Sequence, residues 1–157
     1  MIRLLQVLTI LINITLFPVW LKADESYIPI LVPVTGFLSL EGTAQRNGAI
    51  QALDKAPINL NIKYEVSDTA TSPEVAVTAL HRALSRGQPA AIAAPIFGTQ
   101  MLAMLPIAKR ASVALITVSG TAKLTELNNP FIFRFFPGDS VVKVAHARYI
   151  HEVLGAK

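Results

Sequence analysis

Residues 61–94, NIKYEVSDTATSPEVAVTALHRALSRGQPAAIAA, carry the pattern that decides the fold class. The stretch begins with an alternation of apolar and polar side chains over residues 61–67, which predicts a strand. It ends with a run of small apolar side chains over residues 90–94, which predicts a second, buried strand. A strand, a helix and a strand in this order predict two parallel strands joined by a right-handed crossover.

The helix between these two strands is predicted over residues 73–86. Ser72 can cap its amino end, Pro73 suits its first position, and Gly87 ends it. Apolar side chains at helical spacing give this helix one face for burial, namely Val77, Leu80 and Leu84.

The same alternation continues along the rest of the chain. Asp139 is expected to cap the last predicted helix and Gly155 to end it, while Pro106 predicts a kink or a broken start in the helix that contains it. The pattern as a whole predicts an α/β fold with a parallel sheet covered on both faces. The other strands are predicted over residues 28–34 and 113–117, a short extended piece over 131–136, and the other helices over 42–55, 99–111 and 139–154.

Two prolines conflict with this prediction. Pro29 and Pro33 both fall in the first predicted strand, which would be central in the sheet, and proline removes a hydrogen-bond donor from a strand. We therefore expect Pro33 to lie just past the end of that strand.

The composition excludes several classes of function. The chain has 157 residues, enough for one domain with an apolar core, and 52% of them are hydrophobic. It has no cysteine, and three scattered histidines predict no metal site. The net charge of +4 comes from dispersed basic residues, a pattern that argues against nucleic-acid binding. We expect no metal and no cofactor.

The first 23 residues have the pattern of a secretory signal peptide. Arg3 precedes an apolar run from Leu4 to Leu21, and Ala23 is a small residue at which a signal peptidase could cut. The alternative is an uncleaved membrane anchor, because the run approaches the length that spans a bilayer. Both interpretations place the chain from residue 24 onward outside the cytoplasm, in the periplasm or an equivalent compartment.

Loops that follow the strands are the places to look for a ligand. In open parallel sheets, ligands bind at the carboxyl ends of the strands, and helix amino ends there can hold an anionic group. Ser119 and Thr121 add hydroxyl groups to one of these loops, although the same residues also suit ordinary turns and helix caps. The four loops are residues 35–41, 67–72, 95–99 and 118–125.

Catalytic motifs are weak in this sequence, and we expect no enzyme. It has no G-x-S-x-G elbow and no Walker motif, and the spacing of Gly36 and Gly42 does not fit the dinucleotide fingerprint. Asp68 ends a predicted strand, where it could mimic a ribose-binding acid or accept hydrogen bonds from loop backbone. We favour the second role.

The chain carries an ordered series of short motifs. The series includes Asp68, Ser119-Gly120-Thr121 and Arg134 followed by Asp139, together with these stretches: residues 33–36, 47–49, 72–74, 94–95, 105–108, 113–116 and 129–133. This series resembles the N-terminal lobe of a type I periplasmic binding protein of the leucine/isoleucine/valine-binding family. The resemblance implies a three-layer α/β/α lobe with a flavodoxin-like strand order. It also implies that the chain is the extracytoplasmic solute-binding component of an ABC importer, with a membrane permease as partner.

The resemblance also implies the residues that bind the solute. Ser119, Gly120 and Thr121 match the family segment that holds an amino-acid ligand, and Phe97 and Gly98 stand where the family has serines. Phe97 offers no hydroxyl, which puts an α-amino-acid ligand in doubt. Glu41 stands opposite an aromatic residue of the family, where it could meet a cation or face solvent.

The resemblance covers one lobe of the family's two. We expect a truncated chain over residues 24–157 whose second lobe is absent, or is supplied by another chain. A module that has lost ligand binding is the alternative function, followed by a Rossmann-type nucleotide-binding enzyme.

Overall fold

The computed structural model describes residues 25–156, and the predicted signal peptide at residues 1–23 lies outside them. Five parallel strands form one sheet in the order β2-β1-β3-β4-β5, which is the flavodoxin-like order. This arrangement confirms the predicted fold class. The strands are β1 (Ser26–Val32), β2 (Ile62–Asp68), β3 (Ile92–Ala93), β4 (Leu115–Thr117) and β5 (Ile132–Arg134).

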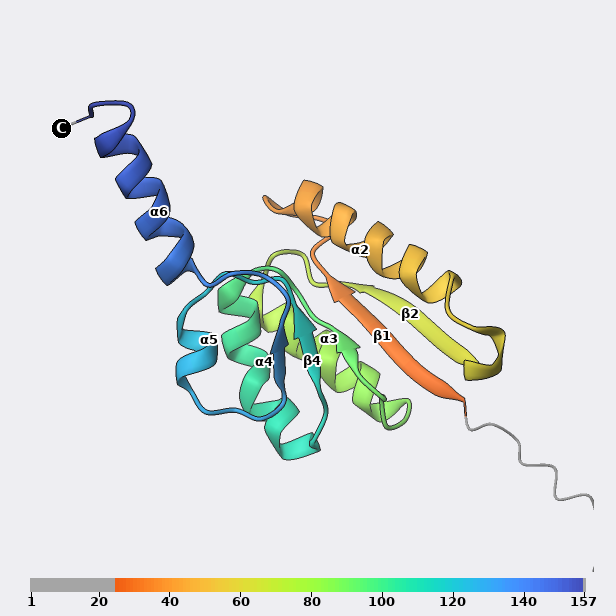
Figure 1. Ribbon diagram of the computed structural model, residues 1–157. Coiled ribbons are helices and arrows are strands. Elements are labelled where there is room, and N and C mark those ends of the chain that lie inside the picture. The colour runs from red at the N-terminus through yellow and green to blue at the C-terminus, as the bar shows by residue number, and fades with distance from the viewer. Residues whose placement is uncertain (1–24, 157) are drawn as a thin grey trace, which may run out of the picture.

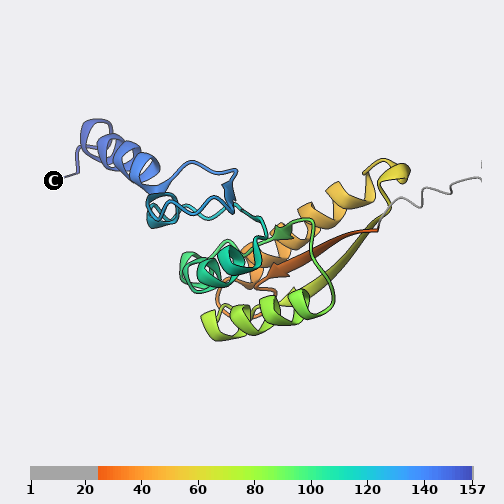
Figure 2. The same cartoon turned by 90° about the horizontal axis from the view of Figure 1, so that it is seen from below.

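Helices lie on both faces of the sheet (Figure 1). Helix α2 crosses one face over β1 and β2, whereas α3 and α4 lie side by side on the other face (Figure 2). Helix α6 points away from the body of the molecule and has no buried residue. The helices are α2 (Ser39–Asp54), α3 (Pro73–Ser85), α4 (Gly98–Ala111), α5 (Lys123–Glu126) and α6 (Asp139–Glu152), with a 3-10 turn η1 (Ile58–Leu60). No helix within residues 25–156 has the length and apolar character that crossing a membrane requires.

Helix α3 forms as its sequence signals predict. The hydroxyl of Ser72 accepts a hydrogen bond from the N–H of Val75 (3.3 Å), Pro73 is the first helical residue, and Gly87 follows the last turn. The side-chain cap satisfies one of the backbone donors that a helix leaves free at its amino end. The buried face of α3 packs on α4 and on the sheet.

The main core lies between the sheet and the α3/α4 layer. Leu31, Ile92 and Leu115 point into it from three strands and are fully buried. Burying an aliphatic side chain of this size contributes roughly 1.5–3 kcal/mol. The helices supply the rest of the cluster, chiefly Ala76, Ala79, Leu80, Met101, Met104, Leu105 and Ala108.

The conflict posed by the two prolines is resolved in β1. Pro33 lies just past the strand's end, as predicted, and Pro29 lies within the central strand. The N–H of Ser26 and the carbonyl of Val32 both bond toward β2, so by alternation Pro29 directs its missing donor toward β3. Strand β3 is only two residues long and pairs with β1 at Ile30. Pro29 therefore removes no hydrogen bond from the long β1–β2 pairing.

Of the two alternatives predicted at Pro106, the broken start does not occur, because helix α4 runs from Gly98 to Ala111 through that proline. Pro106 is exposed, so the carbonyl left without its N–H partner can bind water. The predicted cap of α6 is wrong. Gly138, and not Asp139, is the N-cap of α6. Asp139 is the first helical residue instead, and its N–H donates to the carbonyl of Gly120 (2.6 Å).

Candidate functional site

The carboxylate of Asp68 joins two loops at the carboxyl edge of the sheet. One oxygen, Oδ1, accepts hydrogen bonds from the N–H groups of Val34 (2.9 Å), Thr35 (3.2 Å) and Ala70 (2.8 Å). The other, Oδ2, accepts from the hydroxyl of Thr35 (2.6 Å). Asp68 thus has the backbone-binding role that the sequence favoured, and it holds the β1–α2 loop against the β2–α3 loop.

These hydrogen bonds also set the protonation of Asp68. Burial raises the pKa of this carboxyl, but the hydrogen bonds from Thr35 and from the neighbouring backbone N–H groups favour the charged form and lower the pKa below its usual value. Asp68 is therefore an ionised structural acid at neutral pH.

The β3–α4 loop is the third loop at this edge, and Gln100 connects it to the others. Gln100 is a fully buried side chain in the first turn of α4. Its amide Nε2 donates to the carbonyls of Thr69 (2.9 Å) and Ser72 (3.1 Å) in the β2–α3 loop. This contact fixes where α4 begins relative to the other loops.

The amino end of α4 has backbone N–H groups without a hydrogen-bond partner in the described residues. The N–H of Met101 is the first in the helix to find a partner, the carbonyl of Phe97 (3.1 Å). The N–H groups of residues 98–100 have no acceptor within the part of the chain that the structure describes, and Phe97 provides no side-chain cap. Free N–H groups at a helix amino end carry partial positive charge and bind anions.

Thr121 lies directly against this helix end. A β-carbon on Gly98 would overlap the hydroxyl of Thr121, so only glycine allows the two segments to come this close. Ser119 lies beside them, with its hydroxyl 3.5 Å from that of Thr121 and almost no exposed surface. The structure therefore brings together Gly98, Ser119, Gly120 and Thr121, which the sequence singled out from two separate loops.

The loop that carries Ser119 and Thr121 is fixed at its start. The hydroxyl of Thr117, at the end of β4, donates to the carbonyl of Pro95 (2.8 Å) and accepts from the N–H of Ser119 (3.0 Å). Thr117 and Ser119 are both buried, so these hydrogen bonds are shielded from water. The β3–α4 and β4–α5 loops consequently hold a fixed separation.

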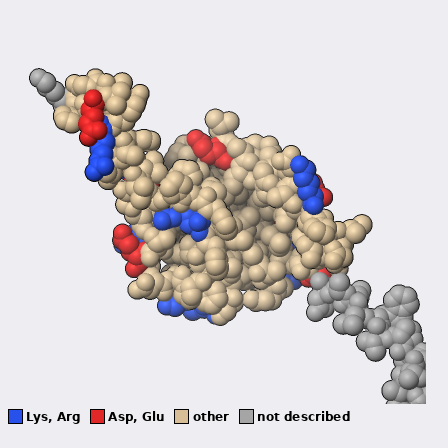
Figure 3. Space-filling view, viewed as in Figure 1, with Lys and Arg blue, Asp and Glu red and all other residues tan. Residues whose placement is uncertain are grey.

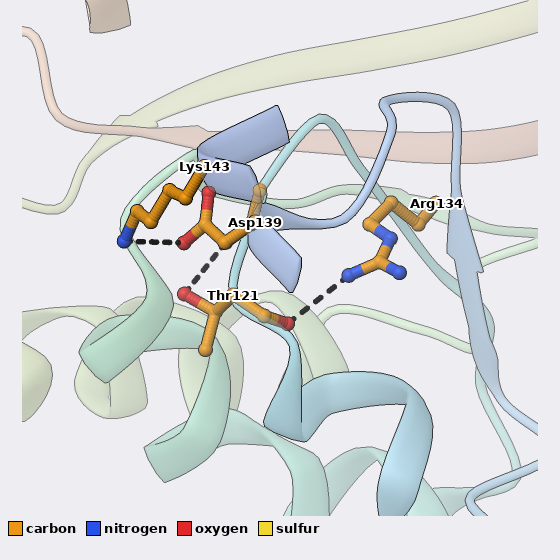
Figure 4. A network of polar contacts seen from close by, with 5 residues as sticks. Thr121, Arg134, Asp139 and Lys143 are labelled. Atoms are coloured by element: carbon orange, nitrogen blue, oxygen red, sulfur yellow. Dashed lines mark hydrogen bonds and ion pairs between the residues drawn. The ribbon is translucent and has the colours of Figure 1, made fainter. Parts of the chain in front are cut away.

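Two charged residues hold the other end of this loop (Figure 4). Arg134, at the end of β5, donates to the carbonyl of Thr121 (3.1 Å) and to the hydroxyl of Thr125 (3.4 Å). The N–H of Asp139 donates to the carbonyl of Gly120, and its carboxylate contacts Gly120 and pairs with Lys143 (3.3 Å). The carbonyls of Gly120 and Thr121 are thereby engaged, which fixes the position of the Thr121 hydroxyl beside Gly98.

Arg134 and Asp139 were not among the predicted contact residues, although both belong to the ordered series of motifs. Apart from that series, their sequence signal was their place at the end of an extended piece and the start of a helix. Their effect on the loop depends on contacts with residues 120–125 that spacing alone does not show.

The remaining predicted residues lie at the margin of this arrangement. Phe97 packs edge to face against Phe37, with ring centroids 5.3 Å apart, and Phe37 is 74% exposed. The two rings form an apolar wall next to Gly98. Glu41 is exposed on α2, where it lines a groove on the α2 face of the sheet. The structure does not bring Glu41 into contact with Gly98 or Thr121.

The chemistry available at this edge suits binding. It offers backbone N–H donors, two hydroxyl groups and an apolar wall, a set that matches an anionic head with an apolar body. Within residues 25–156, no three acidic or histidine side chains are grouped so that they could hold a metal ion.

A comparison with known protein families shows which family this chain belongs to. The family model described as a periplasmic binding protein matches residues 25–157. The chain belongs to the periplasmic binding protein family. The resemblance seen in the ordered series of sequence motifs is thus confirmed. A comparison with curated proteins gave no match.

Solved structures of periplasmic binding proteins share the fold. A leucine-binding protein from Thermotoga maritima is 26% identical, with a TM-score of 0.78 over 84% of this chain and 38% of its own. A branched-chain amino acid transporter substrate-binding protein from Streptococcus pneumoniae, in complex with isoleucine, is 22% identical, with a TM-score of 0.75 over 85% of this chain and 40% of its own. A solute-binding protein of an ABC transporter from Rhodopseudomonas palustris, in complex with 3,4-dihydroxybenzoic acid, is 24% identical, with a TM-score of 0.63 over 71% of this chain and 31% of its own.

This chain therefore spans less than half the length of these periplasmic binding proteins. The residues it shares with them form the lobe described above.

Proposed function

We propose that this chain is the solute-binding component of an ABC importer, acting outside the cytoplasm and passing its solute to a membrane permease. It binds and does not catalyse. The observation that carries the proposal is the convergence of the free N–H groups of α4 with the hydroxyls of Ser119 and Thr121 in a chain of this family.

The solute we propose is a small carboxylic acid. Its carboxylate accepts hydrogen bonds from the N–H groups of residues 98–100 and from the hydroxyl of Thr121, and its body lies against the rings of Phe97 and Phe37. The two solved relatives that hold ligands support this class, because isoleucine and 3,4-dihydroxybenzoic acid are both carboxylic acids.

The amino group of an amino-acid solute has no partner among the site residues within residues 25–156. Phe97 carries an aromatic ring where the family has a hydroxyl group, and Glu41 contacts neither Gly98 nor Thr121. We therefore propose that this lobe selects for the carboxylate, whereas a second lobe, from further chain or from another protein, supplies contacts to the rest of the solute. Burial between two walls gives such pockets most of their affinity.

A titration followed by NMR tests the proposal, because shifts of backbone amides report even millimolar binding. The purified chain is titrated separately with isoleucine and with 3,4-dihydroxybenzoate. We expect saturable shifts at residues 98–100 and 119–121 with at least one of the two acids. Thr121→Ala should weaken that binding by roughly tenfold or more, since a hydrogen bond to a charged group is lost. Thr78→Ala, which removes a hydroxyl on α3 that bonds only to Glu74, is the matched control.

An interaction module without a ligand is the second candidate. The hydrophobic ring of Phe97 at a position where the family has a hydroxyl favours it. Spectra that do not respond to either acid, in both the unchanged chain and Thr121→Ala, would support this candidate and refute solute binding.

A further inference from the structure

Two consecutive residues of the β2–α3 loop have an unusual backbone conformation. Ala70 (φ 48°) and Thr71 (φ 54°) both lie in the left-handed region, which residues with a β-carbon rarely adopt. Thr71 is the rarer case, because its side chain is branched at the β-carbon. Such a conformation costs free energy, persists only where the surroundings hold it, and is found often at functional sites. The contacts of this loop therefore bear on function.

Hydrogen bonds from neighbouring residues hold this loop. The N–H of Ala70 donates to Oδ1 of Asp68 (2.8 Å). The buried amide of Gln100 donates to the carbonyls of Thr69 and Ser72, which lie on either side of the two left-handed residues. The surroundings therefore keep the strained backbone in place without a ligand.

The hydroxyl of Thr71 makes two hydrogen bonds to the β1–α2 loop. It donates to the carbonyl of Thr35 (3.0 Å) and accepts from the N–H of Leu38 (3.4 Å). These two partners flank Gly36 and Phe37, so one buried hydroxyl holds the backbone on both sides of the aromatic residue. Gly36 allows this approach, because its φ is +86° and a β-carbon there would come within 2.6 Å of the same hydroxyl.

The ring of Phe37 depends on its backbone for its position. The residue is 74% exposed, and its ring packs edge to face on the ring of Phe97, which directly precedes the free N–H groups of α4. A side chain with so little burial is held mainly by the segment that carries it. Few charged side chains lie on the face of the molecule that carries α2 (Figure 3), so contact with these rings, rather than charge, can distinguish one solute body from another.

We infer that Thr71 is a positioning residue that sets the solute selectivity of this lobe. Its hydroxyl holds Phe37 against Phe97, so the apolar wall is in place before a carboxylic acid binds, and a fixed wall loses less conformational entropy on binding. The lobe thus selects acids that have an apolar body over acids that have none. The selectivity rests on the proposed function, whereas the position of Phe37 can be measured without a ligand.

Thr71→Val and Thr69→Val form a matched pair of variants. Both residues are buried threonines of the same loop, and both changes replace a hydroxyl group by a methyl group. The hydroxyl of Thr69 makes no hydrogen bond within the described residues, so its loss should change little. Thr71→Val instead leaves the N–H of Leu38 and the carbonyl of Thr35 without their partner. Thr71→Ser keeps the hydroxyl and should behave as the unchanged chain does.

NMR of the ligand-free chain measures the contact between the two rings. Nuclear Overhauser effects between the ring protons of Phe37 and Phe97 should be present in the unchanged chain, in Thr69→Val and in Thr71→Ser, and should be lost or much weaker in Thr71→Val. Effects of full strength in Thr71→Val would overturn the inference, whether or not any acid binds. Thr71→Ala, which removes the hydroxyl without adding a methyl group in its place, gives the same test if Thr71→Val does not fold.

Titrations with benzoate and with acetate at constant ionic strength measure the selectivity, because both carry a carboxylate and only benzoate has an apolar body. We expect Thr71→Val and Phe37→Ala each to lower the ratio of benzoate affinity to acetate affinity by roughly threefold or more. The double variant should lower it no further than Phe37→Ala alone, since Thr71 acts through Phe37. An equal loss for both acids, or a further loss in the double variant, would overturn the inference and leave the proposed function intact. An unchanged chain that binds neither acid would refute the proposed function and the selectivity with it.

Discussion

The hydroxyl of Thr121 occupies the volume that a β-carbon at position 98 would need. This relationship joins the amino end of α4 to the loop after β4. It explains why glycine begins α4, and it places a hydroxyl group next to three free backbone N–H groups. Much of the proposed binding chemistry depends on this one close approach.

Gly98→Ala should therefore lower the free energy of unfolding and distort the proposed binding site. The added methyl group meets Thr121, and overpacking of this kind typically costs about 1–3 kcal/mol. Gly48→Ala is the matched control, because a β-carbon there meets nothing within 4 Å and alanine suits a helix interior better by about 1 kcal/mol. Urea unfolding should show Gly98→Ala less stable and Gly48→Ala more stable than the unchanged chain. Equal stability of the two variants would contradict the close approach.

Asp68 should make stability depend on pH in the acid range. Its pKa in the folded chain lies below the unfolded value, so its contribution is complete above that unfolded value, near 4, and is lost as the pH falls through the folded pKa. Asp68→Asn should remove this dependence and destabilise the fold by about 1–3 kcal/mol at neutral pH.

Urea unfolding at a series of pH values measures this effect. Glu126→Gln removes an exposed carboxylate that makes no hydrogen bond or ion pair within the described residues, so it serves as the control. An Asp68→Asn chain whose stability falls with acid as steeply as that of the unchanged chain would refute the assigned role.

Arg134 should control the geometry of the loop that carries Thr121. Arg134→Ala removes two hydrogen bonds to this loop, and we expect weaker binding of the carboxylic-acid probe together with shifted amide signals at residues 119–122 before any ligand is added. Arg134→Lys should not restore either property, because an ammonium group cannot reproduce the fork of the guanidinium. Arg110→Ala, at an exposed site on α4, should leave the loop signals in place.

The cap of α3 gives a prediction that is independent of any ligand. Ser72→Ala removes the hydroxyl that accepts from Val75 and should lower the free energy of unfolding by about 1 kcal/mol. Ser112→Ala, an exposed serine at the carboxyl end of α4, removes a hydroxyl that caps no helix amino end. Thermal unfolding that shows no difference between the two variants would contradict the cap.

Local sequence signals predicted much of the fold because they act over short distances. The cap at Ser72, the proline at 73 and the glycine at 87 define α3 within a single stretch of chain. Alternation and apolar runs likewise located four of the strands, including the end of β1 before Pro33, and β5 lies within the predicted extended piece. Asp68 could be assigned a backbone-binding role because it ends a strand beside a loop.

Contacts between distant segments could not be predicted in the same way. Arg134 and Asp139 act on residues 120–125 only after β5 has paired with β4, and Gly98 meets Thr121 only after α4 has packed on the sheet. Glu41 stays a predicted binding residue; its place on α2, beside the groove, likewise depends on how α2 packs on the sheet.

A crystal structure of this chain with a bound carboxylic acid, isoleucine or 3,4-dihydroxybenzoate, tests the central claim most directly. The account predicts the carboxylate within hydrogen-bonding distance of the N–H groups of residues 98–100 and of the hydroxyl of Thr121. A ligand held elsewhere, for example in the groove beside α2 with the amino end of α4 left to water, would contradict it.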